Sequence, residues 1–261
     1  MIESFFRDLD ASGVKYLLIS GQASVLYGAA TFSEDIDLWL EPSRANLERF
    51  RSVLSAHEAR FYKLTPPFEL EIMRRGHGFH FVLPQRSNET VFLDVMGCPP
   101  RIGAFGAARD RSNSLETEWG VIPTIGIWDL VELKKTQRIE DYPVIGRLVL
   151  AAALQGLTRA EQVGWALANI FTLPELQRFF EELPAVLNLW PEGQQMELRE
   201  FGLHTVRGEE APGAVERAVQ ELFQRRISAC QDADRTYWRP ILAELRAFRR
   251  DNRLMQEGEP V

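Results

Sequence analysis

The sequence predicts an α+β protein, with strands confined to the part of the chain before Asp141 and helices alone after it. The run from Val14 to Ile19 is apolar apart from one lysine, as in a central strand. Residues 35–40 place acidic and apolar side chains in turn, which is typical of a strand with one buried face. Beyond Asp141 the apolar residues recur only at helical spacing.

The first half of the chain predicts strands and helices in alternation. A helix begins at Ile2 and is ended by Gly13, and a second, short helix follows the first strand. Ser43 is the expected N-cap of a third helix. The remaining predictions are the short helix at 22–27, the third helix at 44–57, strands at 79–83 and 89–96 around a polar connection at 84–88, a loop-rich stretch at 101–118, a strand at 121–125 and a helix from about Trp128.

The second half predicts only helices. Five segments carry helical apolar spacing, at 144–153, 158–171, 174–187, 214–227 and 236–250, separated by Gly, Pro or acidic breaks. We therefore expect three regions: a domain at 1–141 that contains the sheet, a helical domain at 142–254 and a flexible tail at 255–261.

Composition excludes several classes of protein. The formal net charge of −7 over 261 residues offers no general attraction to nucleic acid, so an RNA substrate would need a local basic patch. Cys98 and Cys230 lie far apart and form no CxxC pair, which argues against a zinc site or a disulfide framework. The sequence has no signal-peptide pattern and no apolar stretch of membrane-spanning length, so we expect a cytoplasmic protein that does not enter membranes.

The strand at 35–40 carries the first candidate site. Side chains two apart on a strand point the same way, so Asp35 and Asp37 project together while Ile36 and Leu38 enter the core. Two such carboxylates suit a hard divalent cation, Mg²⁺ or Mn²⁺. An isolated Asp-x-Asp is more often a solvated strand face. The small residues Ser20-Gly21 make the metal interpretation more specific, because they let backbone N–H groups approach an anion such as a triphosphate.

A third carboxylate lies in another strand. Asp94 is the one charged residue between Val91 and Met96, and a carboxylate in such a run either faces a site or costs several kcal/mol unless it is compensated. If its strand neighbours the strand at 35–40, three carboxylates converge, as two-metal phosphoryl or nucleotidyl transfer requires. His77 and His80 have no further ligand at metal-binding spacing, so sheet packing or solvation is the better interpretation for both.

These residues resemble the nucleotidyltransferase superfamily, especially the small bacterial members related to the AbiEii-type toxins. Ser20-Gly21, Gly28, Ser33 and the Asp35-x-Asp37 pair fall on the family pattern of a small-residue turn, a helix that ends near a glycine, and Asp-x-Asp. Thr31 stands where the family has an arginine. The resemblance implies a mixed sheet flanked by helices, a magnesium or manganese ion held by Asp35, Asp37 and Asp94, and an NTP contacted by the turn and by Ser33.

A further likeness to the family follows the last predicted strand. Lys134, Arg138 and Asp141 share one helix edge if the helix continues that far, and they resemble the Leu-x-x-Lys, Arg and Asp pattern of AbiEii-type relatives. There the lysine lies at the active-site cleft, so Lys134 is the candidate for the triphosphate, with Lys135 as its neighbouring rival. For Arg138 and Asp141 a salt-bridge network is an equal alternative.

The resulting expectation is a magnesium-dependent enzyme that moves a nucleoside monophosphate from an NTP such as ATP to a hydroxyl of RNA (tRNA for example), protein or a small molecule. In this expectation Asp94 acts on the acceptor hydroxyl. The resemblance also implies a toxin–antitoxin or phage-defence setting with a cognate antitoxin as partner. Two alternatives stay open: a non-catalytic nucleotide-binding or protein-interaction module on the same fold, and an antibiotic nucleotidyltransferase with an acidic pocket for aminoglycoside cations.

Overall fold

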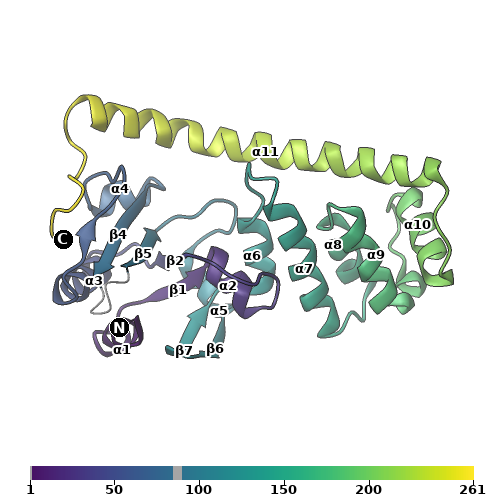
Figure 1. Ribbon diagram of the computed structural model, residues 1–261, viewed down its shortest axis with the longest axis horizontal. Helices are drawn as coiled ribbons and strands as arrows, with labels where there is room; N and C mark the ends of the chain where they lie inside the picture. Colours follow the sequence, from purple (N-terminus) through teal and green to yellow (C-terminus); the bar gives the residue numbers. More distant parts are fainter. Residues whose placement is uncertain (1, 85–89) are drawn as a thin grey trace. The chain divides into compact units, whose positions relative to one another are not determined.

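The computed structural model describes residues 2–84 and 90–261, and they form two compact units (Figure 1). The first unit comprises residues 1–26, 30–133 and 236–261 and contains the sheet, and the second comprises residues 27–29 and 134–235 and is helical. The predicted ranges 1–141, 142–254 and 255–261 divide the chain differently, because residues 236–261 group with the sheet. The predicted connection at 84–88 lies outside the described residues except for Pro84.

The sheet has seven strands in the order β3-β4-β5-β2-β1-β7-β6. The strands are β1 (Tyr16–Ile19), β2 (Asp35–Leu40), β3 (Arg60–Phe61), β4 (Gly78–Pro84), β5 (Thr90–Met96), β6 (Asn113–Thr117) and β7 (Gly120–Thr124). β2 is parallel to β5 and β1 is parallel to β7, whereas the other four pairs are antiparallel. The predicted α+β fold, a mixed sheet flanked by helices with a helical region after it, is therefore confirmed.

One face of the sheet forms the main core of the first unit. Ile36, Leu38 and Leu40 of β2 are buried on this face together with Leu93 and Val95 of β5. Helices α1 (Ile2–Ala11) and α3 (Arg44–Ala56) supply apolar residues to the same core, among them Phe5, Phe6, Phe50 and Leu54. Because side chains alternate along a strand, the acidic residues of β2 and β5 lie on the opposite face. We call this opposite face the carboxylate face.

Shorter helices complete the sheet unit. They are α2 (Ser20–Leu26), α4 (Leu70–Arg74), α5 (Phe105–Asp110) and α6 (Ile127–Leu133). The stretch at 101–118, which we expected to be loop-rich, contains α5 and β6. The missed helix has only six residues and its N-cap position holds Ala104, whose side chain cannot cap. Phe105 of α5 packs edge-on against the buried Trp39, at 5.4 Å between ring centroids.

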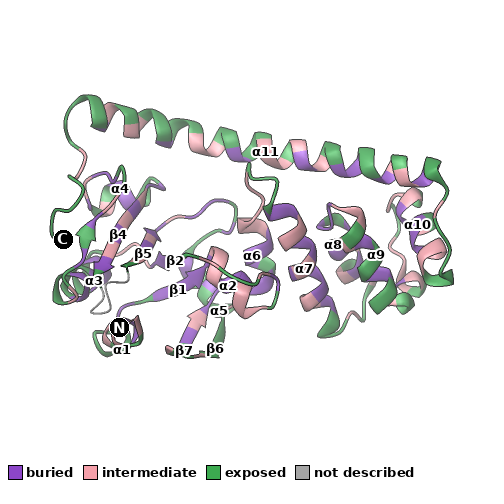
Figure 2. Cartoon of the chain, in the orientation of Figure 1, coloured by how far each residue is buried: buried purple, intermediate pink, exposed green. Residues whose placement is uncertain are grey.

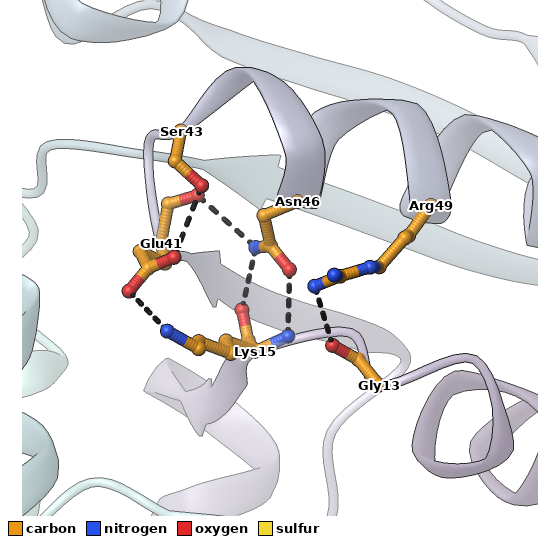
Figure 3. A network of polar contacts seen from close by, with 6 residues as sticks. All are labelled: Gly13, Lys15, Glu41, Ser43, Asn46 and Arg49. Carbon is orange, nitrogen blue, oxygen red and sulfur yellow. Dashed lines mark hydrogen bonds and ion pairs between the residues drawn. The ribbon is translucent and has the colours of Figure 1, made fainter.

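A polar network fixes the end of β2 that is remote from its aspartates (Figure 3). The buried Asn46 side chain of α3 accepts a hydrogen bond from Lys15 N–H at 2.7 Å and donates to the carbonyls of Lys15 and Glu41 at 2.9 and 3.0 Å. The Lys15 ammonium lies 2.9 Å from the Glu41 carboxylate. The Ser43 hydroxyl donates to Glu41 instead of capping α3, so Ser43 occupies the predicted N-cap position without the predicted bond.

The last residues of the chain add to the sheet edge. The N–H of Phe61 donates to Glu259 and the N–H of Gly258 donates back to Phe61, both at 2.9 Å. Arg60 and Pro260 form an antiparallel bridge, and Val261 N–H donates to Ala59. The segment at 255–261, which we expected to be a flexible tail, is hydrogen-bonded along β3.

The second unit contains α7 (Asp141–Leu154), α8 (Ala160–Ala168), α9 (Leu173–Glu182), the 3₁₀ helix η1 (Pro184–Leu189) and α10 (Met196–Arg207). The long helix α11 (Gly213–Arg250) begins in this unit and ends in the sheet unit. It joins the two helices predicted at 214–227 and 236–250, and it continues through Pro240. Buried and exposed positions alternate along it (Figure 2). None of the described helices is both long and apolar enough to cross a membrane.

The helix that was expected to carry Lys134, Arg138 and Asp141 is interrupted. α6 ends at Leu133, and α7 begins at Asp141. Thr136 explains the break, since its hydroxyl donates to the Asp141 carboxylate at 2.6 Å and accepts from Arg138 N–H at 3.1 Å. Such local side-chain bonds compete with helical backbone bonds. The helix does not continue that far, so the condition under which Lys134, Arg138 and Asp141 would share one helix edge is not met.

Candidate active site

The three predicted aspartates lie on neighbouring strands. Asp37 of β2 is directly opposite Asp94 of the parallel strand β5, and Asp35 is opposite Phe92. Paired residues of adjacent strands project from the same face, and neighbouring strands lie about 4.8 Å apart. Asp35, Asp37 and Asp94 therefore share the carboxylate face, where all three are half-exposed.

Asp94 has a partner that the sequence did not predict. Its Oδ1 lies 2.7 Å from Nδ1 of His80, which is directly opposite it on β4. His80 projects away from its buried neighbours Phe79 and Phe81, as strand alternation requires. The alternation in Phe79-His80-Phe81 was a usable signal for the face, but the register of β4 against β5 was not readable from the sequence.

The turn after β1 lies against the segment that leads into β2. A Cβ added to Gly21 would lie 2.2 Å from Oγ of Ser33, so a larger residue here would require Ser33 to move. The Ser33 hydroxyl donates to the Asp35 carbonyl at 3.2 Å, and the Gln22 side chain donates to the Ser33 carbonyl at 2.9 Å. Two of the predicted nucleotide-binding residues, Gly21 and Ser33, thereby lie together at the start of the strand that carries the aspartates.

Ser20 adopts a backbone conformation that is uncommon for a residue with a side chain. Its φ is 59°, and it is the first residue of α2. Left-handed conformations of non-glycine residues cost free energy and are concentrated at functional sites. The Ser20 carbonyl accepts a hydrogen bond from the buried Ser24 hydroxyl at 2.8 Å, which helps to hold the turn in this shape.

The predicted triphosphate contact Lys134 lies in the helical unit. Its ammonium is 2.9 Å from the Asp141 carboxylate, and both side chains are largely buried, at 13% and 9% exposure. Asp141 also accepts the Thr136 hydroxyl. The described contacts of Lys134 thus belong to the junction between α6 and α7.

The donor set on the carboxylate face fits a hard divalent cation. Carboxylate oxygens are the ligands that magnesium prefers, and Asp35 and Asp37 offer two of them on one strand face. Within residues 2–84 and 90–261, no group of three or more His, Cys, Asp or Glu side chains is arranged so that it could hold a metal ion by itself. Magnesium is usually held by one or two carboxylates together with water and substrate phosphates, so two aspartates meet its ordinary requirement.

Comparison with known proteins gives remote structural likenesses only. No family model matches the sequence, and the search of curated proteins gives no match. The chain is similar to the crystal structure of an antigenic nucleotidyltransferase-like protein from Paracoccidioides brasiliensis, over 83% of this chain and 94% of that one. The sequence identity is 13% and the TM-score is 0.36, which is too remote to say anything about the activity of this chain.

Proposed function

We propose that the carboxylate face catalyses nucleotidyl transfer from an NTP to a hydroxyl group. The observation that carries the proposal is the placement of Asp37 opposite Asp94, with Asp35 two residues along the same strand. Asp35 and Asp37 would hold magnesium or manganese. That ion, when bound, would neutralise the triphosphate and make its α-phosphorus more electrophilic.

Asp94 is the proposed general base of this reaction. The acceptor oxygen forms a bond to the α-phosphorus, the bond from that phosphorus to the bridging oxygen breaks, and pyrophosphate leaves. The hydroxyl proton passes to the Asp94 carboxylate. The contact with His80 supports this role, because the imidazole fixes the direction of the Asp94 side chain and occupies Oδ1.

We further propose that the turn at Ser20-Gly21 and the Ser33 segment lie along the triphosphate. The close approach of Ser33 to Gly21 supports this placement, since it brings the two segments side by side so that one ligand can contact both. Lys134 remains a proposed phosphate ligand on the strength of the family resemblance alone. Binding would require its ammonium to exchange or share its contact with Asp141.

The acceptor is proposed only as a hydroxyl-bearing RNA, protein or small molecule. A toxin–antitoxin setting, with a cognate antitoxin as partner, is part of the same proposal.

The test is transfer of labelled phosphate from each α-labelled NTP, with magnesium, to bulk tRNA, protein extract or aminoglycosides. Asp37→Asn keeps the size of the side chain and removes one charge, so transfer should fall by about a hundredfold or more. Wild-type protein that binds NTP and transfers nothing to any acceptor would instead support the non-catalytic alternative.

A further inference from the structure

Two aromatic side chains form a tilted pair on the carboxylate face. The rings of Tyr62 and Phe92 lie 4.8 Å apart between centroids, at an interplanar angle of 35°, and both residues are half-exposed. Tyr62 follows β3 directly, and its N–H donates to the His80 carbonyl at 2.9 Å. The register of β3 and β4 therefore places Tyr62 beside His80, and its ring leans toward Phe92 of β5.

The pair borders the proposed catalytic residues. Phe92 is directly opposite Asp35, and Asp94 lies two residues further along β5 on the same face. The backbone of Phe92 is therefore one strand spacing, about 5 Å, from that of Asp35, so a flat group stacked on the ring would lie beside this aspartate. Its substituents could reach the reacting centre without any movement of the sheet.

A cation accompanies the rings. The Lys63 ammonium lies 5.2 Å from the centroid of the Tyr62 ring, within the range of a cation–π contact, and Lys63 is exposed. A protein of net charge −7 offers little general attraction to an anion, so a lysine placed next to a stacking surface provides the local positive charge that such a ligand needs.

The segment that carries Tyr62 is held in place by hydrogen bonds of Thr65. Thr65 is fully buried, and its hydroxyl accepts from the His80 N–H at 3.2 Å and donates to the Tyr62 carbonyl at 2.7 Å. The Thr65 carbonyl accepts from Met255 N–H of the C-terminal segment at 2.9 Å. A fixed aromatic surface loses little conformational entropy on binding.

We propose that Tyr62 and Phe92, with Lys63, bind a nucleobase and its phosphate. We call these three residues the base platform. Stacked aromatic residues beside a cation are the chemistry by which proteins hold unpaired bases. The base belongs either to the NTP or to the unpaired end of an RNA acceptor. The inference deepens the proposed function and rests on it, because it assigns a substrate subsite next to the same carboxylates.

The experiment measures binding by titration calorimetry with three probes in magnesium buffer: ATP, inorganic tripolyphosphate and a short single-stranded RNA. Tyr62→Leu and Phe92→Leu keep an apolar side chain and remove the ring. Each should weaken binding of ATP or of the RNA by about five- to a hundredfold and leave tripolyphosphate binding unchanged. Tyr62→Phe, the matched control, keeps the ring and should bind as wild type does.

The probe that binds more weakly to the leucine variants shows whether the base belongs to the NTP or to an RNA acceptor. Loss confined to ATP assigns the base platform to the NTP, and loss confined to the RNA assigns it to the acceptor. Lys63→Gln changes an exposed position and should not disturb the core. It should weaken binding of the same probe, and the slope of log affinity against log salt concentration should fall by about one unit. Unchanged ATP and RNA binding in both leucine variants overturns the inference, as does a folded wild type that binds neither probe.

The proposed function fails in a different way. Suppose that the wild-type protein transfers no label to any acceptor, while the Tyr62→Leu variant binds ATP or RNA more weakly than the wild type. The base platform is then supported and the proposed catalysis is not. If both leucine variants transfer label normally and bind ATP and RNA as the wild type does, the proposed catalysis is supported and the base platform is not. Melting curves of each variant show whether it is folded before either conclusion is drawn.

Discussion

At the scale of single residues, the central feature is the concentration of negative charge on one sheet face. Asp37 and Asp94 face each other across parallel strands, and Asp35 is on the same side. Like charges in such proximity destabilise the fold unless a cation, a proton or a hydrogen-bond donor compensates them. The His80 ring lies in contact with Asp94, and a divalent cation would offset the negative charge of the two aspartates on β2.

Asp37→Asn should therefore leave the metal-free protein as stable as wild type or more stable. The substitution removes one of three like charges and keeps the shape of the side chain. Calorimetric melting in the presence of EDTA measures this directly, and magnesium with NTP should raise the melting temperature of wild type more than that of the variant. A lower melting temperature of the variant in EDTA would assign Asp37 a structural role instead.

His80 is expected to be a positioning residue that acts through Asp94. His80→Leu should lower kcat by about tenfold or more and change the KM for NTP little, because the residue directs the base and does not contact the nucleotide. His80→Asn retains a donor on the same strand face and should recover part of the loss. Equal losses of kcat in the two variants would contradict a positioning role.

Lys134→Ala tests the proposed phosphate contact. A lost charge contact to phosphate is worth roughly 1.5–3 kcal/mol, or about ten- to a hundredfold in affinity for a non-hydrolysable NTP. Asp141→Asn is the matched control, because it breaks the same ion pair and keeps the lysine. If both variants bind NTP as wild type does, the lysine serves only the junction between α6 and α7.

At the scale of elements, the Asn46 network explains how β2 is held in register. The Asn46 side chain, which is 1% exposed, adds three hydrogen bonds beside the backbone bond from Glu41 N–H to the Lys15 carbonyl (Figure 3). Asn46→Ala removes these three bonds, although the Lys15 carbonyl keeps its bond from Glu41, and should cost about 1–3 kcal/mol of unfolding free energy. Chemical denaturation measures it, and Ser52→Ala on the exposed side of α3 should change the stability by much less.

The ion pair in the same network predicts a pH dependence. The hydrogen bond from Lys15, more than that from Ser43, lowers the pKa of the Glu41 carboxyl below its ordinary value. A lowered folded-state pKa stabilises the protein above the ordinary pKa, and this contribution disappears as the pH falls through the folded-state value. Glu41→Gln should thus be less stable than wild type at pH 7 and approach it below about pH 4. A stability difference that is independent of pH would exclude this linkage.

The elements also show what the sequence could predict. The strands of Asp35 and Asp94 were predicted because alternating or continuous apolar residues report burial directly. The order of strands was not, since Tyr62 and His80 reach the site only through the pairing of β3, β4 and β5. The break after α6 was missed because the bonds of Thr136 depend on where Asp141 lies in the folded chain.

At the scale of the whole molecule, the last residues of the chain belong to the sheet that carries the site. The end of α11 is tied to this unit by the Tyr237 hydroxyl, which donates to the Cys98 carbonyl at 2.8 Å, and by Glu244, which lies 2.9 Å from the buried His77. The chain then returns along β3, and Met255 meets Thr65 at the base of the Tyr62 segment.

Deletion of residues 255–261 should therefore destabilise the sheet unit and loosen the Tyr62 segment. The deletion removes backbone hydrogen bonds to Phe61, Thr65 and Ala59 and the partly buried side chains of Met255 and Val261. At about 1 kcal/mol for each hydrogen bond, together with the lost apolar burial, the unfolding free energy should fall by roughly 3–6 kcal/mol.

The matched control deletes only Pro260 and Val261, which keeps the Met255 bond to Thr65 and should cost less. Hydrogen exchange at Tyr62 N–H should accelerate in the longer deletion far more than in the control. Equal exchange in the two truncated proteins would show that the bonds to His80 hold the segment without the tail.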